Sequence, residues 1–227
     1  MRRGVAIGAA LLVLGVLLAL WYRERAATNG TPGPLPAPNL SRFDAAFERH
    51  MTELADVPAF RERLQGLPRK EVRTAIQSLA AKGMRRLPDE RLEARTRIVA
   101  RMLQELDVET CGAMATGKQN DAVHDAAVIV LDPPSLDEWV ALSFEAARAE
   151  LENAPAERPS PQELQLALGA LFERVPEADA GRLRQALASL SEQTPSEACW
   201  AARTTYAAVP SLPVPVARVL ARELAGP

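Results

Sequence analysis

The stretch LEARTRIVARMLQEL, residues 92–106, decides the fold class. Its buried-type side chains recur at spacings of four, three, four and three residues, at Leu92, Thr96, Val99, Leu103 and Leu106. An α-helix turns once every ~3.6 residues, so these spacings place the five side chains on one face. The stretch therefore predicts an amphipathic helix with one buried stripe.

Helix signals continue on both sides of this stretch. Capping residues predict helix starts at Ser41 and Ser135, and capping boxes that contain proline predict further starts at Ser160 and Thr194. Residues 128–131 (VIVL) resemble a strand, but no second strand is present to pair with them, so they are expected to end a helix. The sequence predicts an all-α fold, a bundle or array of about nine or ten short helices separated by proline and glycine.

Residues 4–22 (GVAIGAALLVLGVLLALWY) form an uncharged apolar run. As a helix this run spans roughly 28 Å, close to the ~30 Å hydrocarbon core of a bilayer. We expect it to bind the lipid bilayer as an uncleaved single-pass anchor. A cleaved secretory signal and a buried core helix are the alternatives. Arg2 and Arg3 favour a cytoplasmic N-terminus, which places the remaining chain outside the cytoplasm.

A linker is expected next, because residues 26–39 hold four prolines and two glycines. The chain then divides into an anchor (1–25), the linker (26–39) and an all-helical extracytoplasmic domain (40–227) that is long enough to bury a core. The excess of arginine over lysine, 24 against 3, is typical of a GC-rich bacterial genome. The expected location is therefore the bacterial inner membrane, with the C-terminal domain in the periplasm.

The two cysteines, Cys111 and Cys199, lie in similar surroundings. Residues 109–116 (ETCGAMAT) match residues 197–204 (EACWAART) at four positions, which suggests half-repeats at about 40–133 and 134–227. Cysteines of an exported domain usually pair, so a Cys111–Cys199 disulfide is expected. Two buried reduced cysteines and a catalytic thiol are the alternatives.

No catalytic residue, metal site or cofactor is predicted. Residues 112–119 (GAMATGKQ) have the spacing of a phosphate-binding loop, but Gln119 replaces its metal-binding hydroxyl residue, so a helix end at Gly117 is expected instead. His50 is expected on a helix surface or in a groove, and His124 on a solvated face. The metal-ligand pairs H-E-x-x-H and C-x-x-C and the nucleophile motif G-x-S-x-G do not occur.

Charge is unevenly distributed along the domain. Residues 40–104 carry 14 Lys and Arg against 9 Asp and Glu, whereas residues 105–200 carry 6 against 18. The two parts either pack against each other or form a dipolar surface that attracts a charged partner. The candidate partner-binding residues are Arg85, Arg86, Arg91, Arg95 and Arg101. Nucleic acid is not an expected partner, because the domain is acidic and poor in aromatic residues.

The order of anchor, Pro-rich linker and helical domain, together with the triplet Arg42-Phe43-Asp44, resembles that of membrane-anchored lipase foldases. The aromatic and small residues that follow the triplet in that family are missing here, and the chain is shorter. The leading hypothesis is a membrane-anchored extracytoplasmic protein-interaction module, not an enzyme, that binds another envelope protein. The resemblance implies a folding factor or steric chaperone as the alternative, and an envelope enzyme is the third possibility.

Overall fold

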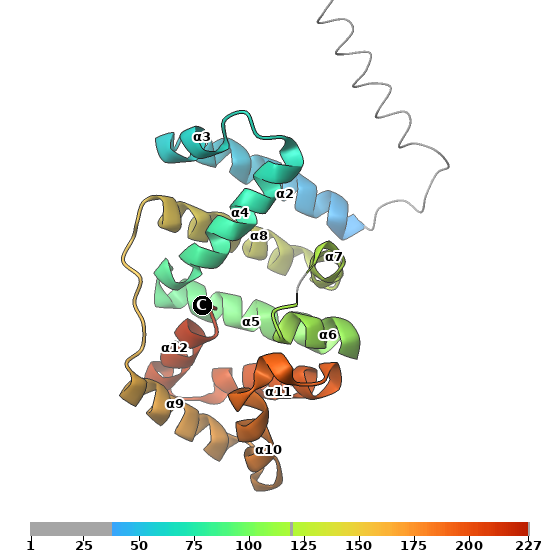
Figure 1. Ribbon diagram of the computed structural model, residues 1–227, viewed down its shortest axis with the longest axis vertical. Coiled ribbons are helices and arrows are strands. Elements are labelled where there is room, and N and C mark those ends of the chain that lie inside the picture. The colour runs from blue at the N-terminus through green and yellow to red at the C-terminus, as the bar shows by residue number, and fades with distance from the viewer. Residues whose placement is uncertain (1–37, 119, 227) are drawn as a thin grey trace, which may run out of the picture. The chain divides into compact units, whose positions relative to one another are not determined.

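The computed structural model describes residues 38–118 and 120–226, so the predicted anchor and most of the linker lie outside the described residues. Within that range the chain is all-α, as predicted, and has no strand (Figure 1). None of these helices is both long and apolar enough to cross a membrane. The helices are α2 (Pro38–Leu54), α3 (Pro58–Leu64), α4 (Arg69–Gly83), α5 (Asp89–Glu105), α6 (Val108–Ala115), α7 (Asp121–Ile129), α8 (Pro133–Leu151), α9 (Pro161–Arg174), α10 (Glu177–Ala188), α11 (Pro195–Ala208) and α12 (Val214–Glu223). Three short 3-10 turns accompany them: η1 (Met84–Arg86), η2 (Leu190–Glu192) and η3 (Val209–Ser211).

Both predicted starts that contain proline are confirmed. At α9 the Ser160 hydroxyl accepts the Glu163 amide, and the Glu163 carboxylate accepts the Ser160 amide, which completes the capping box. At α11 the Thr194 hydroxyl accepts the Glu197 amide. The Glu197 carboxylate, however, binds Arg182 of α10 instead of returning to the cap, so this box is only half formed.

Two other predicted helix starts are wrong. α2 begins at Pro38, three residues before Ser41, because proline fits the first turn of a helix. α8 begins at Pro133 rather than after Ser135. Its cap is Asp132, whose carboxylate accepts the Ser135 amide, and proline follows this cap directly. In both cases a proline nearer the N-terminus decides the boundary.

The helices form two groups that meet at α5 (Figure 1). In the first group, α8 packs against α4 and α2. In the second group, α9 packs against α12, and α10 against α11. α5 contacts α8 from the first group and both α11 and α12 from the second. All five residues of the stripe predicted from residues 92–106 are buried, so the amphipathic helix that the sequence predicted is the one that joins the two groups.

The predicted duplication stays a prediction. A helix, a second helix that follows a proline, and a third helix that carries the cysteine occur in this order as α4, α5 and α6, and again as α9, α10 and α11. α8 begins the predicted second half, yet it packs mainly against α4 of the first half. The two sequence halves therefore interlock rather than fold side by side.

The longest described segment outside the helices is residues 152–160, which joins α8 to α9 along one side of the domain (Figure 1). Two arginines hold this connection in place. The Arg86 guanidinium donates to the Ala154 carbonyl, and the Arg222 guanidinium pairs with Glu157 at 2.9 Å. The connection thus follows a defined path without any secondary structure of its own.

Two glycines allow helices to touch through their backbones. α4 ends at Gly83, whose φ is −81°, so a glycine is not needed here for a left-handed turn. A Cβ atom on Gly83 would lie 1.8 Å from the Ala146 carbonyl oxygen of α8. A Cβ atom on Gly112 of α6 would lie 2.4 Å from the Pro195 carbonyl oxygen of α11. Gly83 therefore allows α4 to approach α8 closely, and Gly112 allows α6 to approach α11.

We predict that Gly83→Ala lowers the free energy of unfolding by about 3 kcal/mol, because the helix backbones must separate to admit the methyl group. The matched control is Gly169→Ala in α9, where a Cβ atom would meet nothing within 4 Å beyond its chain neighbours and the backbone of its own helix. This control should raise stability by about 0.5–1 kcal/mol, since alanine loses less backbone entropy in a helix. Denaturant unfolding measures both; an equal change in the two variants contradicts the packing argument.

Candidate functional site

The two cysteines form the predicted disulfide. Cys111 of α6 and Cys199 of α11 have Cα atoms 5.2 Å apart, and both side chains are buried. The bond joins positions 88 residues apart in the sequence. The alternatives of two reduced cysteines and of a catalytic thiol are wrong in this structure, because neither cysteine is free.

Arg203 adds a second connection of α11, in this case to the end of α5. Its Nε donates to the Leu103 carbonyl and its Nη2 to the Leu106 carbonyl, each at 2.6 Å. These carbonyls close α5, where the helix has no amides left to pair with them. The sequence analysis missed this contact, because a single arginine in an Ala-rich helix carries no signal of which distant helix it caps.

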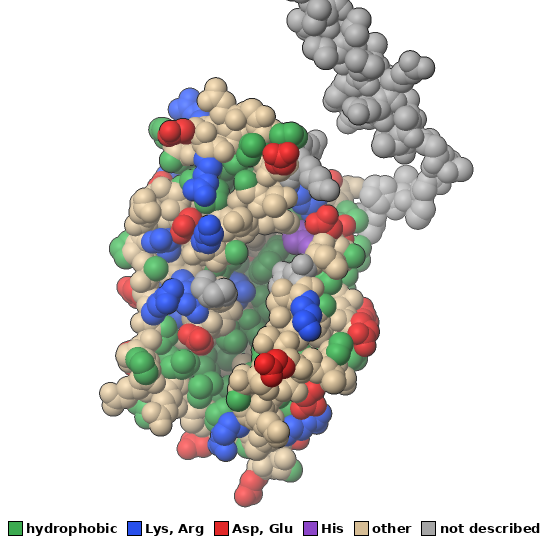
Figure 2. Space-filling model, viewed as in Figure 1, with side chains coloured by type: hydrophobic (Ala, Val, Ile, Leu, Met, Phe, Trp, Pro, Cys, Tyr) green, Lys and Arg blue, Asp and Glu red, His purple; other side chains and the backbone are tan. Residues whose placement is uncertain are grey.

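All five predicted partner-binding arginines have partners inside the domain. Arg85 faces Glu223, Arg86 binds Glu150, Arg91 binds Glu138 and Glu145, Arg95 donates to the Leu224 carbonyl, and Arg101 binds Asp132. The contacts spread over α8, α12 and the α7–α8 junction rather than forming one basic surface. On the face shown in Figure 2, basic and acidic side chains are likewise interspersed.

Arg101 keeps the most exposed side chain of the five. Its side chain is 64% exposed, against 14% for Arg85 and 28% for Arg91. The guanidinium lies 2.7 Å from the Asp132 carboxylate and 3.0 Å from the Ser135 hydroxyl. Of the predicted set, Arg101 is therefore the residue best placed to meet another molecule.

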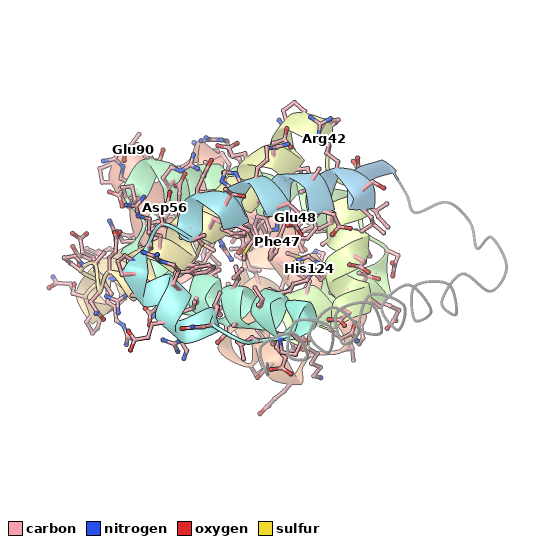
Figure 3. The ribbon with its side chains drawn as sticks, turned by 90° about the horizontal axis from the view of Figure 1, so that it is seen from above. Arg42, Phe47, Glu48, Asp56, Glu90 and His124 are labelled. Atoms are coloured by element: carbon pink, nitrogen blue, oxygen red, sulfur yellow. A yellow bond between two sulfur atoms is a disulfide. The ribbon has the colours of Figure 1, made fainter. Side chains whose placement is uncertain are left out.

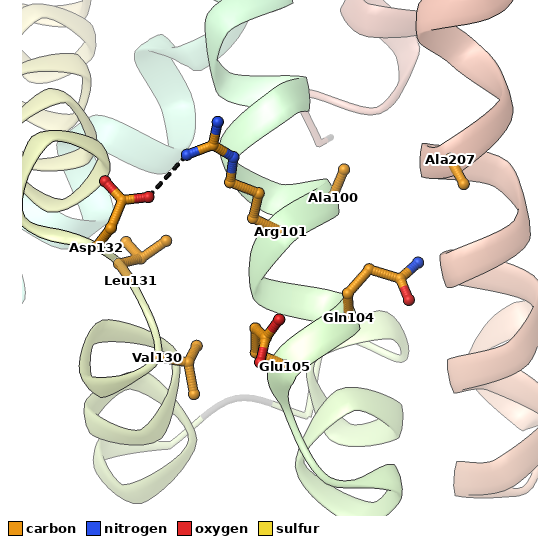
Figure 4. Close-up of a pocket in the computed structure, with 8 residues that line it drawn as sticks. All are labelled: Ala100, Arg101, Gln104, Glu105, Val130, Leu131, Asp132 and Ala207. Carbon is orange, nitrogen blue, oxygen red and sulfur yellow. Dashed lines mark hydrogen bonds and ion pairs between the residues drawn. The ribbon is translucent and has the colours of Figure 1, made fainter.

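Arg101 borders a groove of about 550 Å³ (Figure 4). The groove follows the exposed face of α5, where Ala100 and Gln104 are one helical turn apart. The α7–α8 junction borders it on one side with Val130, and α11 borders it on the other with Ala207 (Figure 4). We refer to this groove as the α5 groove. The small side chains of Ala100 and Ala207 leave room in it for another chain to approach.

The polar end of the α5 groove is fixed by the cap of α8. The Ser135 amide and hydroxyl both donate to the Asp132 carboxylate, and Arg101 adds its charge, so the pKa of Asp132 lies below its ordinary value. Asp132 therefore stays ionised at neutral pH and holds Arg101 at this end of the groove. Glu105, near the other end, is exposed and has no ion pair among the described residues.

His124 is not on a solvated face, and that expectation is wrong. Its side chain is only 23% exposed, and its ring meets the Phe43 ring edge-on with centroids 5.3 Å apart. Burial lowers the pKa of His124 below its ordinary value of 6.5, and the positive charge of Arg73 lowers it further. The carboxylates of Asp125 and Asp121 only partly oppose this effect, so His124 is neutral at pH 7. His50 of α2 is only 24% exposed: its Nδ1–H donates a 2.8 Å hydrogen bond to the Glu53 carboxylate, and its ring lies 5.4 Å from the Phe144 ring of α8.

The described residues of the phosphate-loop pattern form a helix and its end at Gly117, as expected. Gly112 lies inside α6, and Gly117 follows the helix with φ of +73°, the backbone of a helix end. The apolar residues from Val128 belong to α7 and its end rather than to a strand. The described residues contain no group of three or more His, Cys, Asp or Glu side chains that could hold a metal ion.

Comparison with known proteins gives no match, either to a protein family, to a curated protein or to a solved structure.

We predict that the disulfide forms in cells and stabilises the domain. Closing a loop of 88 residues should contribute about 4–5 kcal/mol to the free energy of unfolding. Acid quenching followed by thiol labelling of the full-length protein should therefore label neither cysteine before reduction and both after it. The Cys111→Ser/Cys199→Ser variant should unfold at lower denaturant concentration. Labelling of both cysteines before reduction would show that the native protein is reduced.

We predict that acidification below pH 6.5 destabilises the domain through His124. Its pKa is lower in the folded protein than in the unfolded chain, so the unfolded chain binds the proton more readily. The stability due to the neutral imidazole is complete above pH 6.5 and is lost as the pH falls towards the folded-state pKa. Denaturant unfolding between pH 8 and pH 5 measures this loss. His124→Gln should lose less stability over the same range, and an unchanged pH profile in that variant contradicts the assignment.

Proposed function

We propose that this chain is a membrane-anchored extracytoplasmic protein-interaction module, which binds a segment of another envelope protein in the α5 groove. The proposed location is the bacterial inner membrane, with a cytoplasmic N-terminus and a periplasmic helical domain. No catalytic step is assigned to it. The observation that carries the proposal is the groove itself, which combines apolar walls with a charged residue at each end.

The disulfide supports the compartment. Disulfides persist in secreted and periplasmic proteins and are rare in the reducing cytosol. The Cys111–Cys199 bond therefore agrees with export of the domain. The apolar run at residues 4–22 supplies a means of export and attachment. A domain held on a linker at the membrane meets partners in that membrane at a raised effective concentration.

The shape of the α5 groove supports a helical segment as its occupant. One exposed face of α5 lies between two other elements, so an added helix can pack along it much as α11 and α12 do on the other faces of α5. Ala100 and Ala207 permit close approach, and Val130 offers an aliphatic contact. Amphipathic helices commonly bind in grooves of this kind, with the apolar face inward.

The charges of the groove indicate the orientation of that helix. Arg101 is already paired with Asp132, whereas Glu105 is unpaired among the described residues. A basic residue on the partner helix would gain an ion pair at Glu105 and would be repelled at Arg101. The proposed occupant is therefore an amphipathic helix with a small or aliphatic face and a basic residue near the α5–α6 end of the groove.

In-cell photocrosslinking of the full-length protein tests this proposal. A photoreactive amino acid at Gln104, in the groove, should capture one envelope protein, whereas the same amino acid at Gln185, exposed on α10, should not. Ala207→Trp fills the groove and should reduce this capture by about tenfold, which corresponds to ~1.4 kcal/mol of binding. The matched control is Ala81→Trp, at an exposed alanine of α4 outside the groove, which should leave capture unchanged.

Equal capture from Gln104 and Gln185, or capture from Gln104 that survives Ala207→Trp, would remove the groove from consideration. A cooperative denaturant unfolding transition in each purified variant confirms that the domain is folded. If the captured protein is exported and loses activity when this chain is deleted, the partner is a folding client, and the module acts as a chaperone.

A further inference from the structure

A second cavity, of about 470 Å³, lies between α2, α4 and α7 and is separate from the α5 groove. Phe43 and Phe47 of α2 line it together with Arg73 of α4 and Asp125 of α7. Figure 3 shows the side chains of Phe47 and His124 directed into the space between α2 and α4. Helices from distant parts of the chain thus place aromatic rings and charged groups around one opening.

The aromatic side of this cavity already holds a cation. The guanidinium carbon of Arg73 lies 5.0 Å from the centroid of the Phe43 ring, which is the geometry of a cation–π contact. The Phe47 ring lies 6.0 Å from the Phe43 ring and is only partly buried. Arg73 therefore covers the first ring, and the second ring remains accessible from the cavity.

The charges around the cavity do not balance. Among the described lining residues Arg73 is the one cation, and its guanidinium lies 3.6 Å from the Asp125 carboxylate. Asp44 of α2 and Asp121 of α7 also line the cavity, and neither has an ion pair among the described residues. His124 is neutral at pH 7 and does not offset them. Among the described side chains, two negative charges on two different helices thus have no ion-pair partner.

We infer that this cavity binds the guanidinium or ammonium group of a basic side chain that a partner polypeptide presents. The cation would lie against the Phe47 ring, with the carboxylates of Asp44 and Asp121 on either side of it. Gln77 of α4, which also lines the cavity, offers an amide that can accept a hydrogen bond from the same group. This arrangement combines a flat π surface with opposite charge, which is the combination that recognises arginine and lysine side chains.

The cavity carries this inference independently of the α5 groove. The inference rests on the proposed function in one respect only, namely that the cation belongs to a protein partner. Binding can therefore be measured with a short peptide on the full-length protein, whether or not the α5 groove has a partner.

The test is a titration of the full-length protein in lipid nanodiscs with acetyl-Ala-Arg-Ala-amide, observed through the His124 ring proton resonances. Binding of one basic side chain is expected with a Kd on the order of 1 mM. The neutral peptide acetyl-Ala-Gln-Ala-amide should cause no shift. The Asp44→Asn/Asp121→Asn variant should weaken binding about fivefold, because each exposed ion pair contributes roughly 0.5 kcal/mol.

Two further variants keep the test specific. Asp56→Asn removes an exposed carboxylate outside the cavity, also labelled in Figure 3, and should leave binding unchanged. Gln77→Lys places a lysine of α4 in the cavity, where it should take the place of the peptide cation and abolish binding. This variant tests the inference even if the Asp44→Asn/Asp121→Asn variant folds poorly. Equal shifts with the neutral peptide, no shift with the basic peptide, or unchanged binding in Gln77→Lys would overturn the inference. Tighter binding of free agmatine than of the peptide would overturn the assignment of a polypeptide partner.

Discussion

Every α-helix ends in carbonyl groups that its own amides cannot reach, and a domain built from many short helices must satisfy these groups in some other way. Here, side chains from other helices do so. Arg203 of α11 donates to the end of α5, and Arg95 of α5 to the end of α12. Asn39 of α2 likewise donates to the Ile129 carbonyl at the end of α7. Each of these three caps joins two helices that are distant in the sequence, so the contacts that satisfy helix ends also help to hold the helices together.

This constraint explains why so much of the positive charge of the domain is unavailable to partners. Arginine is suited to capping because its planar guanidinium donates to more than one carbonyl at a time. The basic first part of the domain therefore supplies caps and ion pairs to the acidic later part, for example between Arg91 and Glu145. What remains for recognition lies where pairing is incomplete. Among the described residues, Glu105 in the α5 groove and Asp44 and Asp121 in the second cavity have no ion pair, and both proposed sites are there.

Local patterns predicted much of the helical architecture, whereas contacts between distant segments were largely hidden. The stripe that begins at Leu92 and the capping box at Ser160 depend on neighbouring residues, and both were evident in the sequence. The disulfide followed from the number of cysteines and the expected compartment. The role of Gly83 depends on a distant segment, since its lack of a side chain serves the approach of α8. Arg203 was missed and the cavities were not foreseen, because each requires knowing which helices become neighbours.

The path of the connection between α8 and α9 has a consequence for proteolysis. Residues 152–160 lie outside any helix, and such segments are where proteases cut most readily. A cut there would divide the chain into one piece that contains Cys111 and another that contains Cys199. The disulfide would keep the two pieces covalently attached, and the buried core would hold them in register. A protease that cuts this connection would thus leave the domain as one particle, until a reductant separates its two parts.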